Sequence, residues 1–209
     1  GFSEKPGRTQ GADAIVDAAI AWVARAHPPF FLWVHVMDPH HPYTPVRPGP
    51  WEDPADPAFR RFADAYAARD AAAWSERLRG AGHERALEPG EVEFLIGRYD
   101  AEIRAVDAAI ERLVAALGGP TAIDADGVLA ITADHGEEFL EHGALLHSHT
   151  LHDELIRVPL MLRGRGIPAG VRIAAQVPLL DVASTLLAFA GAPADGLDGR
   201  SLARLWSGD

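Results

Sequence analysis

The sequence predicts an α/β protein with a mixed, mostly parallel sheet flanked by helices. Two observations lead to this expectation. Apolar runs of strand character alternate along the chain with segments whose apolar residues recur at helical spacing. The 209 residues, 48% hydrophobic and 23% charged, are enough for the core of one sizeable domain or of part of a larger one. We expect a single, incomplete α/β domain over 1–209.

The first elements expected along the chain are a helix, a buried strand and a loop. Apolar residues at helical spacing predict a helix over 12–26, which the prolines after His27 end. The continuous apolar run 30–36 indicates a strand buried on both faces. The proline-rich stretch 38–57 cannot pair in a sheet and is expected to be a loop.

Two helices are expected next. Residues 58–80 are rich in Ala and Arg, and the glycines that follow end that helix. The longest helix is expected over 91–117, closed by Gly118-Gly119-Pro120. Its buried side is expected to carry the large apolar residues Phe94, Ile96, Tyr99, Ile103, Val106, Ile110, Leu113 and Val114.

The remaining chain is expected to hold two strands and one further helix. The apolar run 128–133 has the character of a buried strand, and 158–162 forms the next one. Between them, 137–152 looks irregular and leads into a short helical turn. A turn over 164–170 and a helix over 179–189 precede a Pro- and Gly-rich tail.

Composition excludes several classes of function. The net charge of -11 provides no positive field for nucleic acid. The absence of cysteine excludes disulfides, thiolate metal sites and Cys nucleophiles within these residues. No apolar stretch reaches the length of a membrane helix. The start at Gly1, without an initiating Met, indicates the middle of a longer chain, and nothing indicates a compartment.

The residues after the strand at 128–133 are the strongest functional signal. Asp134 and His135 stand at its carboxyl end, where ligands bind in open α/β sheets. An oxygen ligand beside an imidazole indicates half of a metal site. The alternative roles are a helix N-cap for Asp134 and a surface position for His135. Glu137 and Glu138 are expected to be solvated charges near a helix start.

Histidines gather after the expected strands, which points to a metal or anion site. His40 lies on a proline-bracketed loop, where its imidazole could donate or act as a general acid. His147 and His149 could present two imidazoles on one side of an extended segment, although a polar loop would have the same sequence. His41 is expected to be a solvated neighbour, and His35 a satisfied core histidine.

Five segments, in order, resemble the sulfatase family. Residues 29–45 are similar to a strand followed by a Pro-His-x-Pro loop, and Thr132–Glu137 resembles the family's second metal-ligand motif. The other three similarities are the long helix at Tyr99–Asp107, the segment Leu151–Leu160 (with His152 where Tyr is more frequent), and the closing helix and tail at Leu180–Pro193 and Leu197–Leu202. The segment Val46–Glu88 matches nothing recognisable and is the expected source of substrate specificity.

The resemblance implies an alkaline phosphatase-like α/β fold and the hydrolysis of sulfate esters. A formylglycine nucleophile and a divalent cation, expected to be calcium, would perform the reaction. Asp134 and His135 would be metal ligands, and His40 would contact the sulfate or the leaving oxygen. Either His149, as a catalytic residue, or His147, as a substrate-binding residue, would replace the family's sulfate-binding Lys.

Part of the family's machinery has no counterpart in this sequence. The formylglycine motif Cys/Ser-x-Pro-x-Arg and the first Asp-Asp ligand pair are absent. We therefore expect the C-terminal portion of a sulfatase, inactive alone, acting on a small-molecule or carbohydrate sulfate ester as part of a longer chain. The alternatives are a two-metal phosphohydrolase or phosphoethanolamine-type transferase, where the many histidines would favour zinc, and a non-catalytic fold remnant.

Overall fold

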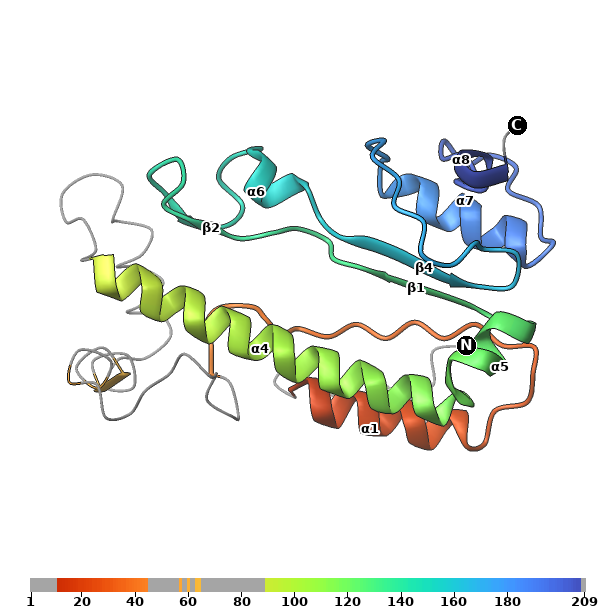
Figure 1. Ribbon diagram of the computed structural model, residues 1–209, viewed down its shortest axis with the longest axis horizontal. Helices are drawn as coiled ribbons and strands as arrows, with labels where there is room; N and C mark the ends of the chain where they lie inside the picture. Colours follow the sequence, from red (N-terminus) through yellow and green to blue (C-terminus); the bar gives the residue numbers. More distant parts are fainter. Residues whose placement is uncertain (1–10, 45–56, 58–59, 61–62, 65–88, 208–209) are drawn as a thin grey trace. The chain divides into compact units, whose positions relative to one another are not determined.

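The computed structural model describes residues 11–44, 57, 60, 63–64 and 89–207 (Figure 1). They form two compact units. Unit 1 lies within 1–116 and 135–157, and unit 2 within 117–134 and 158–209. The loop and helix expected between Pro45 and Gly80, and the unmatched segment Val46–Glu88, lie almost entirely outside the described residues.

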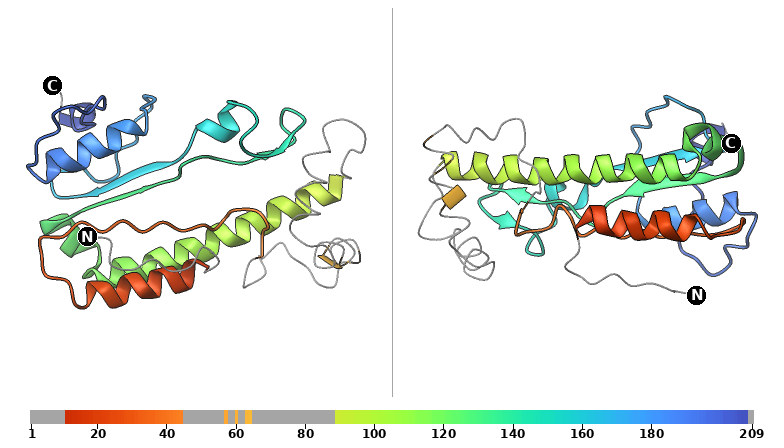
Figure 2. Two further views of the ribbon diagram at one scale, coloured as in Figure 1. Left: turned by 180° about the vertical axis from the view of Figure 1, so that it is seen from behind. Right: turned by 90° about the horizontal axis from the view of Figure 1, so that it is seen from below.

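Two helices, α1 (Ala12–Val23) and α4 (Pro89–Ala116), pack along each other in unit 1 (Figures 1 and 2). The buried residues of α1 are Ala12, Val16 and Ala19, which recur at the spacing of one helical face. At the exposed edge, Arg112 of α4 donates to Asp13 and Asp17 of α1. Both predicted helices are confirmed, although α1 ends before residue 26.

The predicted buried face of α4 is partly wrong. Ile96 and Ile103 are 37% and 42% exposed, whereas Leu95, Ala101 and Glu102 are buried. The prediction chose a single face of large apolar residues, but the helix packs against two different neighbours and so buries different faces along its length. Its C-terminal half packs on α1, and its N-terminal half contacts Tyr43 and Thr44.

The buried strand predicted for 30–36 is not observed. The segment is extended, but no described strand pairs with it. Its exposure alternates as in a strand: Phe31 and Trp33 are 72% and 66% exposed, and Leu32 and Val34 are half-buried. Without a ladder partner, alternate side chains remain in solvent, and His35, expected in the core, is exposed.

A short hairpin replaces the irregular segment expected over 137–152. Strands β2 (Glu138–Phe139) and β3 (Leu145–Leu146) pair antiparallel, and α6 (Asp153–Ile156) is the predicted helical turn. Leu145 packs into the core of unit 1 with Tyr43, Phe94 and Leu95. The hairpin therefore carries its neighbouring polar residues into a buried environment.

Unit 2 is built on an antiparallel strand pair. Strand β1 (Val128–Thr132) pairs with β4 (Leu160–Gly164), with Val128 opposite Gly164 (Figure 1). Both strands were predicted; among the described residues their pairing is antiparallel. Helices α5 (Gly119–Asp126) and α8 (Arg204–Ser207) were not predicted, and α7 (Leu180–Phe189) confirms the closing helix.

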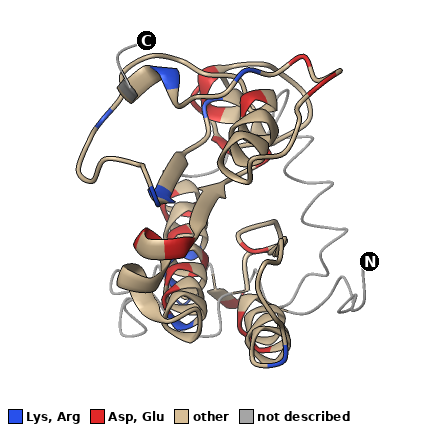
Figure 3. Cartoon of the chain, turned by 90° about the vertical axis from the view of Figure 1, so that its right-hand side faces the viewer, with Lys and Arg blue, Asp and Glu red and all other residues tan. Residues whose placement is uncertain are grey.

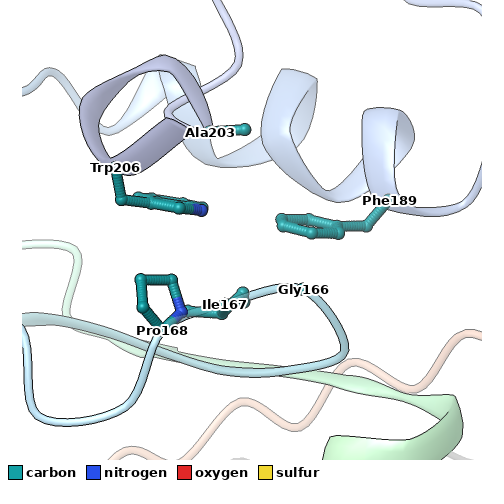
Figure 4. A pocket seen from close by; sticks show the side chains of 6 residues that line it. All are labelled: Gly166, Ile167, Pro168, Phe189, Ala203 and Trp206. Carbon is teal, nitrogen blue, oxygen red and sulfur yellow. The ribbon is translucent and has the colours of Figure 1, made fainter. Parts of the chain in front are cut away.

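Buried polar side chains attach the C-terminal tail to α7. Asp181 accepts the backbone N–H of Arg200 at 2.8 Å, and the Thr185 hydroxyl accepts that of Leu202 at 2.9 Å. The same hydroxyl donates to the carbonyl of Asp181 at 2.7 Å. Beyond this attachment, the rings of Phe189 and Trp206 lie nearly parallel, 6.4 Å apart, over an apolar pocket of about 560 Å³ (Figure 4).

Figure 3 shows Lys, Arg, Asp and Glu residues on the helices of the described chain. The net charge of the full sequence is -11. None of the helices that the structure describes is long and apolar enough to cross a membrane.

Candidate active site

The candidate site in unit 1 begins at Gly136, where the backbone lies against that of Glu154 and Leu155. Its N–H donates to the carbonyl of Leu155 at 2.8 Å, and a Cβ at this position would lie 2.0 Å from the carbonyl oxygen of Glu154. Any larger residue would push the chain away from α6. The glycine therefore lets His135 and the two glutamates after it enter the interior of unit 1.

Glu137 is the first of two buried carboxylates and holds two side chains. Its Oε2 accepts the Tyr43 hydroxyl at 2.7 Å, and its Oε1 lies 2.9 Å from Nδ1 of His147. The side chain of Glu137 is 3% exposed, and that of His147 is 18% exposed. Because the carboxylate accepts, Nδ1 of His147 carries the hydrogen, and the neutral ring has its lone pair on Nε2.

Glu138 is the second buried carboxylate, and its surroundings favour the ionised form. Its Oε1 accepts the backbone N–H groups of His142 and Ala144, both at 3.1 Å, and its Oε2 lies 3.0 Å from Nε2 of His149. Burial alone would raise the pKa of Glu138, but the hydrogen bonds from His149, Ala144 and His142 lower it overall.

Both ring nitrogens of His149 face acceptors. Its Nδ1 lies 3.1 Å from the carbonyl oxygen of His147, and its Nε2 faces the carboxylate of Glu138. Both partners are acceptors, so the two bonds form together only in the imidazolium form. The side chain of His149 is 30% exposed, so the ring is accessible from solvent.

Three of the predicted histidines lie together. The ring of His147 stacks on that of His135 at 4.1 Å and meets that of His40 edge-on at 5.0 Å. Nδ1 of His135 donates to the carbonyl of Gly136 at 2.8 Å, and Nδ1 of His40 to that of His41 at 2.6 Å. In its neutral form, each of the three rings therefore has its lone pair on Nε2, the nitrogen that can accept a proton or bind a metal.

The predicted metal ligands are neighbours in sequence, but they belong to different units. Asp134 is exposed at the end of unit 2, and His135 is half-buried in unit 1. Over the described ranges, no three His, Asp or Glu side chains lie close enough to hold a metal ion. The chemistry of His135 suits a ligand, since its Nδ1–H is held by a carbonyl, but the described residues do not form a complete site.

Three expectations about solvation in this region are wrong. Glu137 and Glu138 were expected in solvent and are 8% and 0% exposed, and His41 is 6% exposed. The two glutamates are buried because the β2–β3 hairpin carries them into unit 1. His41 is buried because its ring lies against that of Tyr43. Tyr43 itself was not singled out, because a tyrosine in a proline-rich loop carries no sequence signal of burial. The rings of two further histidines, His142 and His152, stack with their centroids 3.7 Å apart, and His142 contacts Glu154.

Two further groups near this cluster have shifted pKa values. Burial raises the pKa of Glu102, on α4, to about 7; the hydrogen bond from Thr44 opposes this, and the charge of Asp38 adds to it. Burial, followed by the charges of Glu137 and Asp100, raises the pKa of Tyr99. Both shifts mark a region where charge is shielded from water.

Two solved structures are similar to this chain. A structure solved in complex with its substrate D-glucosamine-2-N,6-O-disulfate is similar with a TM-score of 0.67 and 22% identity, over 93% of this chain and 52% of that one. A phosphonate monoester hydrolase from Silicibacter pomeroyi is 29% identical, with a TM-score of 0.53, over 59% of this chain and 25% of that one. The chain therefore has the alkaline phosphatase-like α/β fold of sulfatases.

The sulfatase family model matches residues 5–192, and the chain belongs to this family. Arylsulfatase K of Danio rerio is 26% identical over 216 aligned residues, which cover 92% of this chain and 40% of that protein. The chain thus spans less than half the length of this relative. The resemblance deduced from five sequence segments is confirmed.

Proposed function

We propose that this chain takes part in metal-dependent hydrolysis of a sulfate ester, as part of a longer protein. The observation that supports this most directly is the pair of buried carboxylates, each holding an imidazole whose other side reaches solvent. Glu137 holds His147, and Glu138 holds His149. Such an arrangement fixes rings for proton transfer and anion binding in a sulfatase-family chain.

Each histidine has a role in the proposal. His149 stands where many sulfatases have Lys: Glu138 keeps its Nε2, and its Nδ1–H, which lies 3.1 Å from the His147 carbonyl oxygen, turns to a sulfate oxygen and forms a charge-assisted hydrogen bond. His147 binds the substrate by accepting a hydroxyl at the lone pair on Nε2, since Glu137 holds Nδ1–H. His40 acts at the leaving oxygen: once its Nε2 has taken up a proton, donation of that proton assists cleavage of the ester bond. The ring contact between His40 and His147 supports a pair of roles that act on one substrate.

The cation of the proposal is divalent, with calcium as the first candidate. Asp134 and His135 would be two of its ligands, and it would supply charge stabilisation for the sulfate. Because the described residues lack a complete set of ligands, no step above depends on the cation. The sequence has no Cys and no Ser-x-Pro-x-Arg segment, so the formylglycine nucleophile would come from outside these 209 residues.

The proposed substrate is a sulfated carbohydrate. The structure similar to this chain that was solved with a glucosamine disulfate supports this class. A binding experiment tests it: the imidazole resonances of His147 and His149 should shift with glucosamine 6-sulfate and much less with glucosamine. His149→Gln should weaken binding about tenfold, the loss of one charge-assisted hydrogen bond, whereas Glu111→Ala, an exposed change on α4, should not. Equal response to both sugars would contradict the proposal.

Hydrolysis itself is tested on the longer gene product that contains this chain. The 209 residues alone should not turn over an aryl sulfate. In the longer protein, Asp134→Ala should lower the rate by roughly a thousandfold, in line with the loss of charge stabilisation in an active site. Hydrolysis by the 209 residues alone, lost in Asp134→Ala, would overturn the need for an external nucleophile.

A second candidate function is the hydrolysis of a phosphate or phosphonate monoester. The phosphonate monoester hydrolase, at 29% identity, and the number of imidazoles favour it. Faster turnover of an aryl phosphate than of an aryl sulfate by the longer protein, with zinc rather than calcium, would select this alternative.

A further inference from the structure

One side chain, Tyr43, connects the helix α4 to the histidine cluster. Its ring is 1% exposed and lies within 6.1 Å of the rings of Tyr99 and Phe139, centroid to centroid. These contacts restrict the ring to one position. The hydroxyl at its end donates to Glu137 at 2.7 Å. The position of this ring therefore determines where Glu137 is held.

The backbone on both sides of the Tyr43–Thr44 peptide is held by α4. Nε of Arg98 donates to the carbonyl oxygen of Tyr43 at 2.9 Å, and Oε1 of Glu102 accepts the N–H of Thr44 at 2.5 Å. Arg98 and Glu102 are four residues apart and so lie on the same face of the helix. One peptide group is thus bound at both its polar atoms by a single rigid element.

We propose that Arg98 and Glu102 are positioning residues that set the tautomer and orientation of His147, acting through Tyr43 and Glu137. The contacts run without interruption from α4 to the Tyr43 peptide, from the Tyr43 hydroxyl to Oε2 of Glu137, and from Oε1 of Glu137 to Nδ1 of His147. Neither α4 residue needs to touch substrate. The biological meaning rests on the proposed function, since His147 is assigned there to substrate binding.

The physical basis is the geometry of a carboxylate with two partners. Glu137 can rotate about its side-chain bonds unless both oxygens are bound. The Tyr43 hydroxyl fixes Oε2, which leaves Oε1 aimed at His147. A correctly aimed acceptor keeps the hydrogen on Nδ1 of His147, and so keeps the lone pair on Nε2. Loosening the Tyr43 peptide would release this restriction.

The tautomer of His147 can be read without substrate or activity. Long-range ¹H–¹⁵N correlation spectra of ¹⁵N-histidine-labelled protein, recorded at one fixed pH, distinguish the two neutral tautomers. The wild type should show a single Nδ1–H pattern for His147, assigned by comparison with His147→Gln. Glu102→Ala should show both tautomers, and Glu102→Gln should keep one, because its amide oxygen still accepts the N–H of Thr44.

Two further variants keep the test decisive if Glu102→Ala does not fold. Tyr43→Phe preserves the buried ring and removes only the hydroxyl, so it should also give both tautomers, and Glu111→Ala on the exposed side of α4 should give one. A single Nδ1–H tautomer in folded Tyr43→Phe would overturn the proposal. Because no substrate is present, this outcome is distinguishable from a failure of sulfate binding or hydrolysis.

Discussion

The two units satisfy their buried polar side chains in different ways. In unit 2, Asp181 and Thr185 bond to backbone groups of the tail. In unit 1, Glu137 and Glu138 hold the imidazoles of His147 and His149, which remain partly exposed. These four side chains follow the rule that buried polar groups are hydrogen-bonded. A bond to the backbone joins two segments, whereas a bond to an imidazole prepares a side chain for chemistry.

The strongest test of this contrast removes the most buried carboxylate. Glu138→Ala should lower the free energy of unfolding by about 4 kcal/mol, since it leaves the His149 ring and two backbone N–H groups without their acceptor. Urea unfolding measures the change, with the exposed Glu93→Ala on α4 as the control. A loss under about 1 kcal/mol would mean that the carboxylate is not held as described.

The stability of unit 1 should depend on pH through the buried carboxyl group of Glu102. Its pKa is raised from 4.5 to about 7 in the folded protein, so folding favours the protonated carboxyl. This stability is fully present below about pH 4.5 and is lost as pH rises through 7. The loss should reach about 3 kcal/mol. Glu102→Gln, which cannot ionise, should flatten that part of the pH profile of unfolding; an unchanged profile would contradict the assignment.

Thr185 tests whether the buried polar groups of unit 2 attach the C-terminal tail to α7. Thr185→Val keeps the shape of the side chain but removes one donor and one acceptor, so stability should fall by about 2 kcal/mol. The tail should exchange its amide hydrogens faster, beginning with Leu202. Because the change is confined to a backbone attachment, the histidine resonances of unit 1 should not move.

The smallest effect is expected at an exposed ion pair of unit 2. Arg163 binds Asp124 through two nitrogens, but both side chains are nearly half exposed, at 49% and 47%. Arg163→Ala should change stability by about 0.5 kcal/mol or less at moderate salt. A larger loss in urea unfolding would show that burial is not what separates strong from weak polar contacts here.

The helices and strands that depend mainly on interactions between residues close in sequence were predicted correctly. The helices α1, α4 and α7 and the strands β1 and β4 match apolar periodicity and Gly or Pro stops. The segment 30–36 did not, because a strand exists only with a partner, and periodicity does not reveal whether one is available. The faces of α4 also differ from expectation, since a helix with two neighbours buries small and charged residues that a hydrophobic pattern omits.

The residue types of the candidate site could be read from sequence: His40, His135, His147 and His149 are placed in one unit, and family membership is confirmed by the match over 5–192. Only the tertiary structure decided which groups hold them. Glu137, Glu138 and Tyr43 are ordinary surface or loop residues by type, and they became buried because the hairpin and α4 enclose them. Sequence records the chemistry available to each residue, whereas burial and hydrogen-bond partners depend on segments distant along the chain.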